Sequence, residues 1–369
     1  MCNFVPKIIK MTHSFTSKLL SWFSENGRQL PWRTTRDPYA IWLSEVILQQ
    51  TRIQQGMAYW ERFMQRWPRV EALAAATEDE VLRMWQGLGY YSRARNLHTA
   101  ARQIVAMGHF PNTIDEIRQL KGVGDYTAAA IGSIAFDLPA AVVDGNVYRV
   151  LARHFGIDVP INTTEGKKTF TALANELLPK GQASAFNQAM MDFGAIQCTP
   201  QSPRCLLCPV AETCVALREG KVGTLPVKLR KLKVKTRRLS YIYIRCNGQT
   251  AIHRRGSGDI WQGLWEPLVV EEGGEAASAS DEGSPHLPSG ADEDSLRTWA
   301  DQFEGSRLTQ LRTDVKHVLT HRVILADFYL LECGNRPPLP GDFIWISEND
   351  WGDYGVSRLV EILIAEVRC

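Results

Sequence analysis

The chain has 369 residues, of which 44% are hydrophobic and 22% are charged. This composition supports two ordinary domains with hydrophobic cores, and it excludes a wholly disordered chain or a small disulfide scaffold. The net charge is only +2, but it is unevenly distributed. Residues 1–238 hold 31 basic and 19 acidic side chains, a net of +12, whereas residues 239–369 hold 11 and 21, a net of −10. The basic first part is typical of a protein that binds an anionic partner.

The sequence contains no run of about 18 apolar residues, which excludes a membrane-spanning helix. Near the amino terminus, Lys7 and Lys10 interrupt the apolar residues before the core of a signal peptide could form. We therefore expect a cytoplasmic monomer with no membrane partner. Four of the eight cysteines lie between positions 198 and 214, and this clustering favours a metal site over disulfide bonds.

The first 200 residues predict helices joined by short turns, because apolar residues recur three and four apart behind capping residues. Thr77 and Glu80 predict a capping box, and Thr113 and Glu116 predict a second one just before a glycine turn. We see no alternating strand pattern here. An all-α domain over residues 15–197 is expected, after an amino-terminal extension of residues 1–14.

From residue 239 the pattern changes to that of strands. Residues 240–245 and 250–253 flank Asn247-Gly248, which predicts a β-hairpin. Residues 323–331 predict another strand, and helical patterns occur at 296–303 and 357–367. A smaller α+β domain over residues 239–369 is therefore expected.

Two segments of the chain have a biased composition. Residues 228–238 hold seven Lys or Arg in eleven positions, so we interpret residues 215–238 as a basic linker that is either a solvated tether or a phosphate contact. Residues 271–295 hold eight Asp or Glu, no Lys or Arg, and many small residues. They predict a disordered acidic insertion.

The clustered cysteines have the spacing C-x6-C-x2-C-x5-C. Four thiolates in so short a loop can bind one centre, and either zinc or a four-iron cluster suits such ligands. The spacing alone does not decide between them. The four residues are Cys198, Cys205, Cys208 and Cys214.

A glycine turn follows residue 120. Gly122 and Gly124 separate a helix that ends from an Ala-rich helix that begins. Glycine permits close approach of the backbone, and the N–H groups of the next helix's first turn can then bind a phosphate. A plain helix cap with a loop is the alternative, but the basic helical setting and the segment at 142–149 favour phosphate binding.

Two carboxylates stand in unusual surroundings. Glu45 lies on the same helical stripe as Ile41 and Leu48, so it is expected to be desolvated with a raised pKa, although a buried salt bridge is the alternative. Asp144 follows two valines and precedes a glycine, where it could equally be a helix N-cap. Cleavage of an N-glycosidic bond needs a proton for the leaving base and negative charge beside a cationic sugar, and two such carboxyls can divide these tasks.

Together these motifs resemble those of the MutY-type adenine DNA glycosylases of the helix-hairpin-helix superfamily. The resemblance covers residues 15–220 densely and is carried by residues 30–33, 42–51, 87–96, 143–153 and 186–194, the glycine turn and the cysteine loop. It implies an all-α helix-hairpin-helix glycosylase domain with its hairpin near 115–135 and one [4Fe-4S] cluster bound by the four cysteines of residues 198–214. It also implies double-stranded DNA as the partner.

The resemblance further implies that Glu45 protonates adenine at N7 and that Asp144 stabilises the sugar cation or bonds to it transiently. Asn146 would orient Asp144, and Tyr126 would complete the network. Tyr126 lies where endonuclease III-like relatives carry the lysine that forms a Schiff base, so hydrolysis without efficient strand cleavage is implied. Lys121 replaces the proline of most relatives, and it is left open whether it contacts phosphate or acts as a lyase.

The target base lies in duplex DNA and must be extruded. By resemblance, Gln50, Leu48 and Tyr90 probe or wedge the base stack with Thr51 nearby. Without the family, these residues would be interpreted as surface and core side chains. The resemblance also assigns the adenine pocket to Arg28, Trp32 and Gln188, and backbone contacts with DNA to Gly122, Val123 and Gly124.

The second domain resembles the Nudix-like module with which these enzymes recognise 8-oxoguanine, through residues 254–266 and 317–321. We find no glutamate-rich helix of the kind that holds magnesium, so binding rather than hydrolysis is expected. Leu319, Thr320 and His321 stand where relatives often have Phe-Ser-His. Thr320 can still offer a hydroxyl, and a pair of histidines without a ligand is the alternative.

The sequence thus predicts a monofunctional DNA glycosylase of base excision repair. It would hydrolyse the N-glycosidic bond of adenine mispaired with 8-oxoguanine, or with G. One alternative is an endonuclease III-like pyrimidine glycosylase and lyase, against which Tyr126 and the second domain speak. The other is a non-catalytic iron–sulfur DNA-binding protein, against which the pair of Glu45 and Asp144 speaks.

Overall fold

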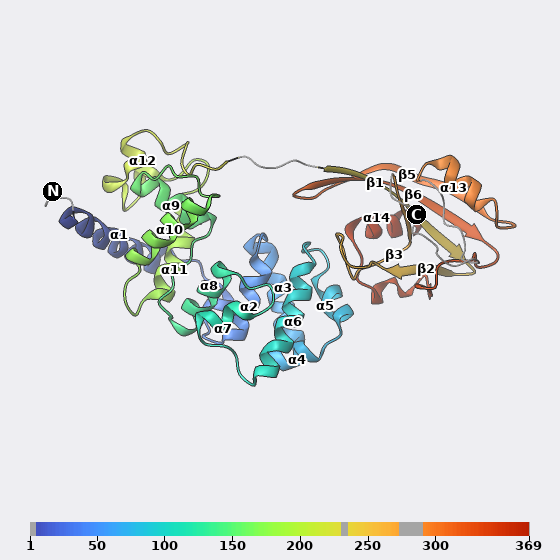
Figure 1. Ribbon diagram of the computed structural model, residues 1–369, viewed down its shortest axis with the longest axis horizontal. Helices are drawn as coiled ribbons and strands as arrows, with labels where there is room; N and C mark the ends of the chain where they lie inside the picture. The colour runs from blue at the N-terminus through green and yellow to red at the C-terminus, as the bar shows by residue number, and fades with distance from the viewer. Residues whose placement is uncertain (1–4, 230–234, 273–290, 369) are drawn as a thin grey trace. The chain divides into compact units, whose positions relative to one another are not determined.

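The computed structural model describes residues 5–229, 235–272 and 291–368, and the chain forms two compact units (Figure 1). The first comprises Met1–Ala75 and Asn96–Arg230, and the second comprises Ala76–Arg95 and Lys231–Cys369. A helical amino-terminal region is followed by a mixed α/β region, so the expected fold class is confirmed.

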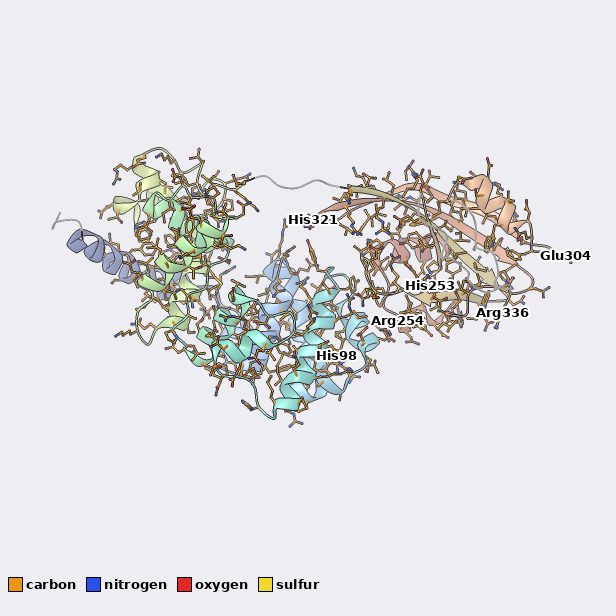
Figure 2. All side chains as sticks on the ribbon, viewed as in Figure 1. His98, His253, Arg254, Glu304, His321 and Arg336 are labelled. Carbon is orange, nitrogen blue, oxygen red and sulfur yellow. The ribbon has the colours of Figure 1, made fainter. Side chains whose placement is uncertain are left out.

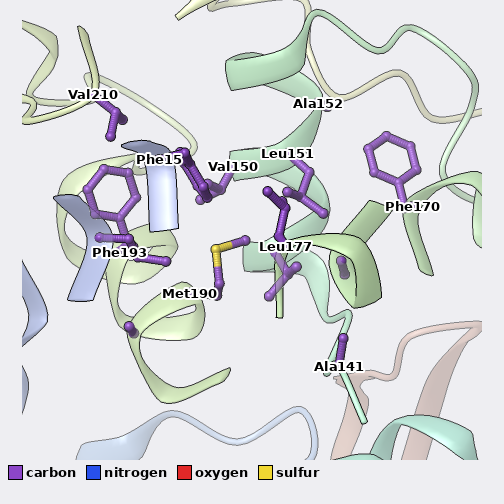
Figure 3. Packing of buried hydrophobic residues seen from close by; sticks show 14 of the residues in the cluster. Phe15, Ala141, Val150, Leu151, Ala152, Phe170, Leu177, Met190, Phe193 and Val210 are labelled. Carbon is purple, nitrogen blue, oxygen red and sulfur yellow. The ribbon is translucent and has the colours of Figure 1, made fainter. Parts of the chain in front are cut away.

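The first unit is built from helices, and its described residues contain no strand. One core lies where α1, α9, α10 and α11 pack together around Phe15, Val150, Phe170, Met190 and Phe193 (Figure 3). The last turn of α11 continues into a π-helical turn, Phe193–Gln197. The helices are α1 (Val5–Asn26), α2 (Pro38–Leu48), α3 (Ile53–Arg66), α4 (Val70–Ala75), α6 (Ser92–Met107), α7 (Ile114–Gln119), α8 (Asp125–Phe136), α9 (Gly145–Phe155), α10 (Thr164–Leu177), α11 (Ala183–Asp192) and α12 (Val215–Arg218).

Two unusually apolar helices of this unit, α2 and α8, pack against each other. Asp37 caps α2 by accepting a hydrogen bond from the Tyr39 N–H, and Pro38 occupies the first turn, where its missing N–H costs nothing. Small side chains in α8, such as Ala129 and Ala130, let Ile41 of α2 approach closely. This packing brings the polar residues of the two helices to a common edge.

Both predicted helix starts are confirmed. Thr77 and Glu80 form a complete capping box at α5 (Glu78–Trp85). Thr113 caps α7, but the second predicted capping box is incomplete, because the Glu116 carboxylate accepts from the Thr113 hydroxyl and not from the Thr113 backbone N–H.

The second unit contains a seven-stranded sheet with the order β3-β2-β1-β6-β5, while β4 pairs with β1 and β7 pairs with β2. β1 and β6 are parallel, from Lys235 beside Arg322 to Cys246 beside Cys333, and the other pairs are antiparallel. Besides α5 (Glu78–Trp85), its helices and strands are β1 (Lys235–Cys246), β2 (Gln249–Arg254), β3 (Trp265–Glu266), β4 (Leu268–Glu271), α13 (Glu293–Ala300), β5 (Arg307–Val318), β6 (Arg322–Cys333), β7 (Phe343–Ser347) and α14 (Arg358–Arg368).

Alternation along β1 produces two hydrophobic layers. Tyr241 and Tyr243 join a core with α14, whereas Ile242 and Ile244 join a core with α13. The sheet is therefore covered by a helix on each face.

The predicted hairpin is confirmed, with Asn247 and Gly248 both at positive φ between β1 and β2. Some boundaries differ from expectation. β1 begins at Lys235 rather than at 240, and the helix expected at 296–303 spans Glu293–Ala300, with Phe303 packed on Trp299 beyond its end. The ends of the predicted acidic insertion are ordered, in β4 and in α13, while its residues 273–290 lie outside the described part of the chain.

Candidate active site

A cavity of about 300 Å³ lies among α2, α8, α9 and α11 of the first unit. Its volume is at the lower end of the range of about 300–1,000 Å³ that small-molecule sites span. The side chains predicted for chemistry or base binding that line this cavity are Arg28, Trp32, Glu45, Leu48, Thr51, Tyr126, Asp144, Asn146 and Gln188. Residues from five separate stretches of sequence thus share one site.

Glu45 lies near the end of α2, and its partly exposed side chain lines the cavity. Its Oε2 accepts a hydrogen bond from the Tyr126 hydroxyl over 3.4 Å. Burial raises the pKa of Glu45 to about 7, and the charge of Asp144 adds to the rise, against the opposing effects of Tyr126 and Arg33. Such a carboxyl is substantially protonated at neutral pH and can donate a proton.

Asp144 is the N-cap of α9. Its Oδ1 accepts from the Val147 N–H and its Oδ2 from the Asn146 amide, both over 2.8 Å. Burial raises the pKa of Asp144, while these donors and the charge of Arg149 oppose the rise. Asp144 is therefore a helix N-cap, and it also lines the cavity that contains Glu45.

Asn146 is itself held in a hydrogen-bond chain. Buried Arg149 donates to the Asn146 Oδ1 over 2.8 Å, to the Gly194 carbonyl over 2.7 Å and to the Cys198 carbonyl over 2.7 Å. Because the Asn146 oxygen is taken by Arg149, its amide nitrogen is left to face Asp144. Gly194 lacks a side chain for a steric reason, since a Cβ there would lie 2.6 Å from the Cβ of Asn146.

Tyr126 lines the cavity with both carboxylates and contacts one of them. Its hydroxyl bonds to Glu45 and also contacts the Met191 sulfur at 3.8 Å. Burial and the two nearby negative charges raise the pKa of Tyr126 well above its usual value. The phenol therefore stays protonated and acts as a donor.

The glycine turn between α7 and α8 has the expected geometry. Gly122 has φ +80°, and a Cβ there would lie 2.7 Å from the Cβ of Asn96. Gly124 is the N-cap of α8, and no side chain caps this helix end. The first N–H groups of α8 therefore depend on solvent or a ligand for partners.

The four clustered cysteines line one small cavity with Arg153 and His154. Arg153 donates to the Cys198 sulfur over 3.5 Å and to the Thr199 and Pro200 carbonyls. Among the described residues, no group of three or more His, Cys, Asp or Glu has the arrangement of a site for a metal ion.

Residues 43–180 match the HhH-GPD superfamily of base excision DNA repair proteins, and residues 240–366 match the NUDIX domain. The chain is 44% identical over 227 residues to an adenine DNA glycosylase of Mus musculus, a match that covers 58% of this chain and 44% of the mouse protein. It is 32% identical over 254 residues to an adenine DNA glycosylase of Buchnera aphidicola, covering 68% of this chain and 73% of that protein. The chain belongs to the family of MutY-type adenine DNA glycosylases.

A solved structure of a thermostable thymine-DNA glycosylase is also similar to this chain. It has a TM-score of 0.54 and 32% identity and covers 57% of this chain and 99% of that chain. The matched region spans less than half the length of the mouse and human relatives. No helix among the described residues is long and apolar enough to cross a membrane.

A second cavity of about 580 Å³ lies within the second unit. Tyr90, Trp261, Leu319, Thr320 and His321 line it, and the Tyr90 and Thr320 hydroxyls are hydrogen-bonded to each other. His321 lies in the loop that joins β5 and β6 (Figure 2). Leu319 packs against the core of the sheet.

Two residues predicted to contact the base stack have strained backbones. Gln50 and Tyr90 have φ of 56° and 47°, which is uncommon for residues other than glycine and is typical of functional positions. Gln50 is exposed and Tyr90 is 45% exposed. Gln50 does not line the cavity that contains Glu45, whereas its neighbours Leu48 and Thr51 do.

Sequence reasoning missed several residues of the first cavity, namely Arg33, Ser44 and Met191, and it also missed the buried Asp192 behind its wall. Arg28 and Arg33 both donate to Asp192. All four lie inside the segments that carry the family resemblance. Only their position in those segments could have identified them as site residues, because no local sequence pattern marks them.

Proposed function

We propose that this chain excises adenine from duplex DNA where it is mispaired with 8-oxoguanine, and secondarily with G. The bond between base and sugar would be hydrolysed, leaving an abasic site without efficient strand cleavage. The observation that supports this most directly is that Glu45 and Asp144 line one cavity, with Tyr126 in contact with Glu45.

Glu45 is proposed as the general acid. Its pKa of about 7 keeps much of the population protonated at neutral pH, and its side chain lines the cavity. Protonation of the purine at N7 lets the bonding electrons leave with the base. General acid catalysis of this kind contributes typically about 10²–10⁴-fold in rate.

Asp144 is proposed to stabilise the cationic sugar, or to bond with it transiently, before water attacks. The donors from Val147 and Asn146 favour its ionised form, and the Asn146–Arg149 chain fixes its orientation. Two carboxyl groups in one site but with different partners can thus divide the acid and the anionic tasks.

Tyr126 accounts for the proposed lack of lyase activity. A phenol with a pKa well above 10 cannot form the Schiff base that an amine forms with the sugar aldehyde. Lys121, whose exposed backbone N–H donates to Gln103 in the glycine turn, is proposed to contact phosphate.

The proposed DNA contacts fall into two sets of residues, all in the first unit except Tyr90, which belongs to the second unit. The uncapped start of α8, with Gly122, Val123 and Gly124, suits a phosphate of the DNA backbone. Gln50, Leu48 and Thr51, together with Tyr90, are proposed to fill the stack from which the adenine is extruded, into a pocket with Arg28, Trp32 and Gln188.

Recognition of 8-oxoguanine is proposed for the second unit. Leu319, Thr320 and His321 line its cavity, and the Thr320 hydroxyl already has a hydrogen-bonding partner there. We further propose a glycosylase domain of residues 15–197, a cluster loop of residues 198–214 and a recognition domain whose sheet begins with β1 at Lys235 rather than at residue 239.

One [4Fe-4S] cluster is proposed on Cys198, Cys205, Cys208 and Cys214. The support is the type of residue, since four thiols line one cavity and Arg153 offers a positive charge beside the Cys198 sulfur, although the described side chains do not have the arrangement of a metal site. When bound, the cluster would cross-link the loop through four iron–sulfur bonds. Arg149 would then connect this loop, at the Cys198 carbonyl, with Asn146.

The proposal is tested with duplexes that carry adenine opposite 8-oxoguanine, adenine opposite G, or an oxidised pyrimidine. We expect release of free adenine from the first two and strand breaks only after alkali. Breaks without alkali in the pyrimidine duplex would identify an endonuclease III-like lyase instead. Binding with no released base would identify a non-catalytic DNA-binding protein.

A further inference from the structure

Asp192 is a fully buried carboxylate, 0% exposed, at the end of α11. It accepts from the Arg28 backbone N–H over 2.9 Å and from the Arg28 Nε over 2.8 Å, and also from a terminal nitrogen of Arg28. It accepts from both terminal nitrogens of Arg33, over 2.8 and 2.9 Å. Although burial acts to raise it, these donors hold the pKa of Asp192 below its usual value.

The two arginines need such an anchor. Both line the cavity, and their side chains remain 31% and 13% exposed. Residues 27–30, between α1 and the short turn Pro31–Arg33, belong to no helix or strand. The backbone hydrogen bonds of regular secondary structure therefore do not fix Arg28. Five donors converging on one carboxylate fix both guanidinium groups.

The same helix end supports the opposite side of the cavity. After Asp192, the π-helical turn Phe193–Gln197 brings Gly194 against Asn146, and the Gly194 carbonyl accepts from Arg149. One turn earlier, Gln188 and Met191 line the cavity. A π-helical turn inside a helix is frequent at functional sites, where it re-aims side chains.

We infer that Asp192 is a positioning residue for base excision, which acts through Arg28 and Arg33 and does not itself touch the substrate. It orients Arg28 toward the extruded base. It also forms an ion pair with Arg33, so that the Arg33 guanidinium does not pair with Glu45. This inference rests on the proposed function, because it assumes that protonated Glu45 is the acid.

The charge balance predicts the direction of the effect. Arg33 already lowers the pKa of Glu45. Without the Asp192 charge, Arg33 is an unpaired cation beside another carboxyl and stabilises ionised Glu45 more strongly. The alkaline limb of the excision rate then moves to lower pH. A shift of one pH unit corresponds to a tenfold lower rate on that limb.

The experiment measures single-turnover release of adenine opposite 8-oxoguanine by the full chain from pH 5 to pH 9. For Asp192→Asn we expect the alkaline limb to shift down by about one unit, and for Asp192→Glu we expect a limb near that of the wild type. Arg33→Gln removes the cation, so its limb should move in the opposite direction. Asp115→Asn, which breaks only an exposed ion pair with Arg118, is the matched control.

The outcomes separate the two claims. A wild type that releases no adenine overturns the proposed function. If the wild type releases adenine but the alkaline limb of Asp192→Asn lies at the same pH as that of the wild type, the positioning role is overturned. This holds even when the rate of the variant is lower at every pH. If Asp192→Asn fails to fold, the Arg33→Gln variant tests the inference instead. An alkaline limb of Arg33→Gln that lies at the same pH as that of the wild type, or at a lower pH, contradicts the inference.

Discussion

The Tyr126 hydroxyl donates to the Glu45 Oε2 across the helix pair α8 and α2. This contact is possible because alanines in α8 let the two helices pack closely, so two residues 81 positions apart meet at the edge of their interface. The phenol opposes the rise in the pKa of Glu45 but does not cancel it. Glu45 thus keeps a hydrogen-bond partner while remaining a proton donor.

Loss of either carboxylate is expected to stop excision. Glu45→Gln removes the proton donor, and Asp144→Asn removes the negative charge while keeping an N-cap for α9. Single-turnover rates should fall by about 10²–10⁴-fold for each. Affinity for the mismatch duplex, measured by gel shift, should be retained. Normal turnover by either variant would contradict the assigned task.

The rate should depend on pH through both groups. Because Glu45 must be protonated, the rate should decline as the pH rises through about 7. Because Asp144 must be ionised and burial raises its pKa, the acid limb should lie above the ordinary aspartate value of 3.8. A pH profile of the single-turnover rate checks both limbs. A rate still rising between pH 7 and 9 would argue against Glu45 as the acid.

Glu45→Gln should also change stability with pH. The pKa of Glu45 is about 7 in the folded chain and 4.5 as the ordinary value, so its contribution is fully present below 4.5 and is lost as the pH rises to 7. The variant should therefore gain about 1–3 kcal/mol relative to the wild type between pH 4.5 and pH 8. Urea unfolding at the two pH values measures this. Glu176→Gln, at an exposed position, should show no such pH-dependent gain.

Tyr126→Lys is expected to add strand cleavage. Burial beside α2 acts to lower the pKa of a lysine, against the charges of Glu45 and Asp144, and the neutral amine can form a Schiff base with the sugar. Breaks should then appear without alkali, and borohydride should trap a covalent complex with DNA. Tyr126→Phe, which keeps the ring and adds no amine, should give neither. Absence of trapping with Tyr126→Lys would show that this position does not reach the sugar.

Thr320→Ala should weaken the preference for 8-oxoguanine over G in the strand opposite adenine. It removes one hydroxyl that now bonds to Tyr90. One hydrogen bond contributes about 0.5–1.5 kcal/mol, so the ratio of the two kcat/KM values should fall by about 2–10-fold. Thr320→Ser keeps the hydroxyl and should retain the preference. An unchanged ratio with Thr320→Ala would reject the contact.

Local patterns were sufficient where the determinant is local. The Thr77–Glu80 capping box and the Asn247-Gly248 turn are set by residues within four positions of each other, and the sequence predicts both correctly. The apolar surroundings of Glu45 in α2 were likewise visible, because its helical neighbours are its spatial neighbours.

Long-range ion pairs were not predictable in this way. Asp192 meets Arg28 and Arg33 across 164 and 159 positions, and nothing in the local sequence marks that meeting. The basic run before residue 239 misled for the same reason. Arg237 and Arg238 belong to β1 and pair with Glu271, Asp259, Asp314 and Asp327 of the acidic half. They are therefore ordered strand residues, and a solvated tether was the wrong interpretation for them.

The parallel pairing of β1 with β6 determines when the second unit can fold. Lys235 lies beside Arg322, so the central strands of the sheet cannot join until almost ninety further residues have been synthesised. The helices of residues 5–75 and 96–229 have no such requirement and can be complete while the ribosome is still making the sheet.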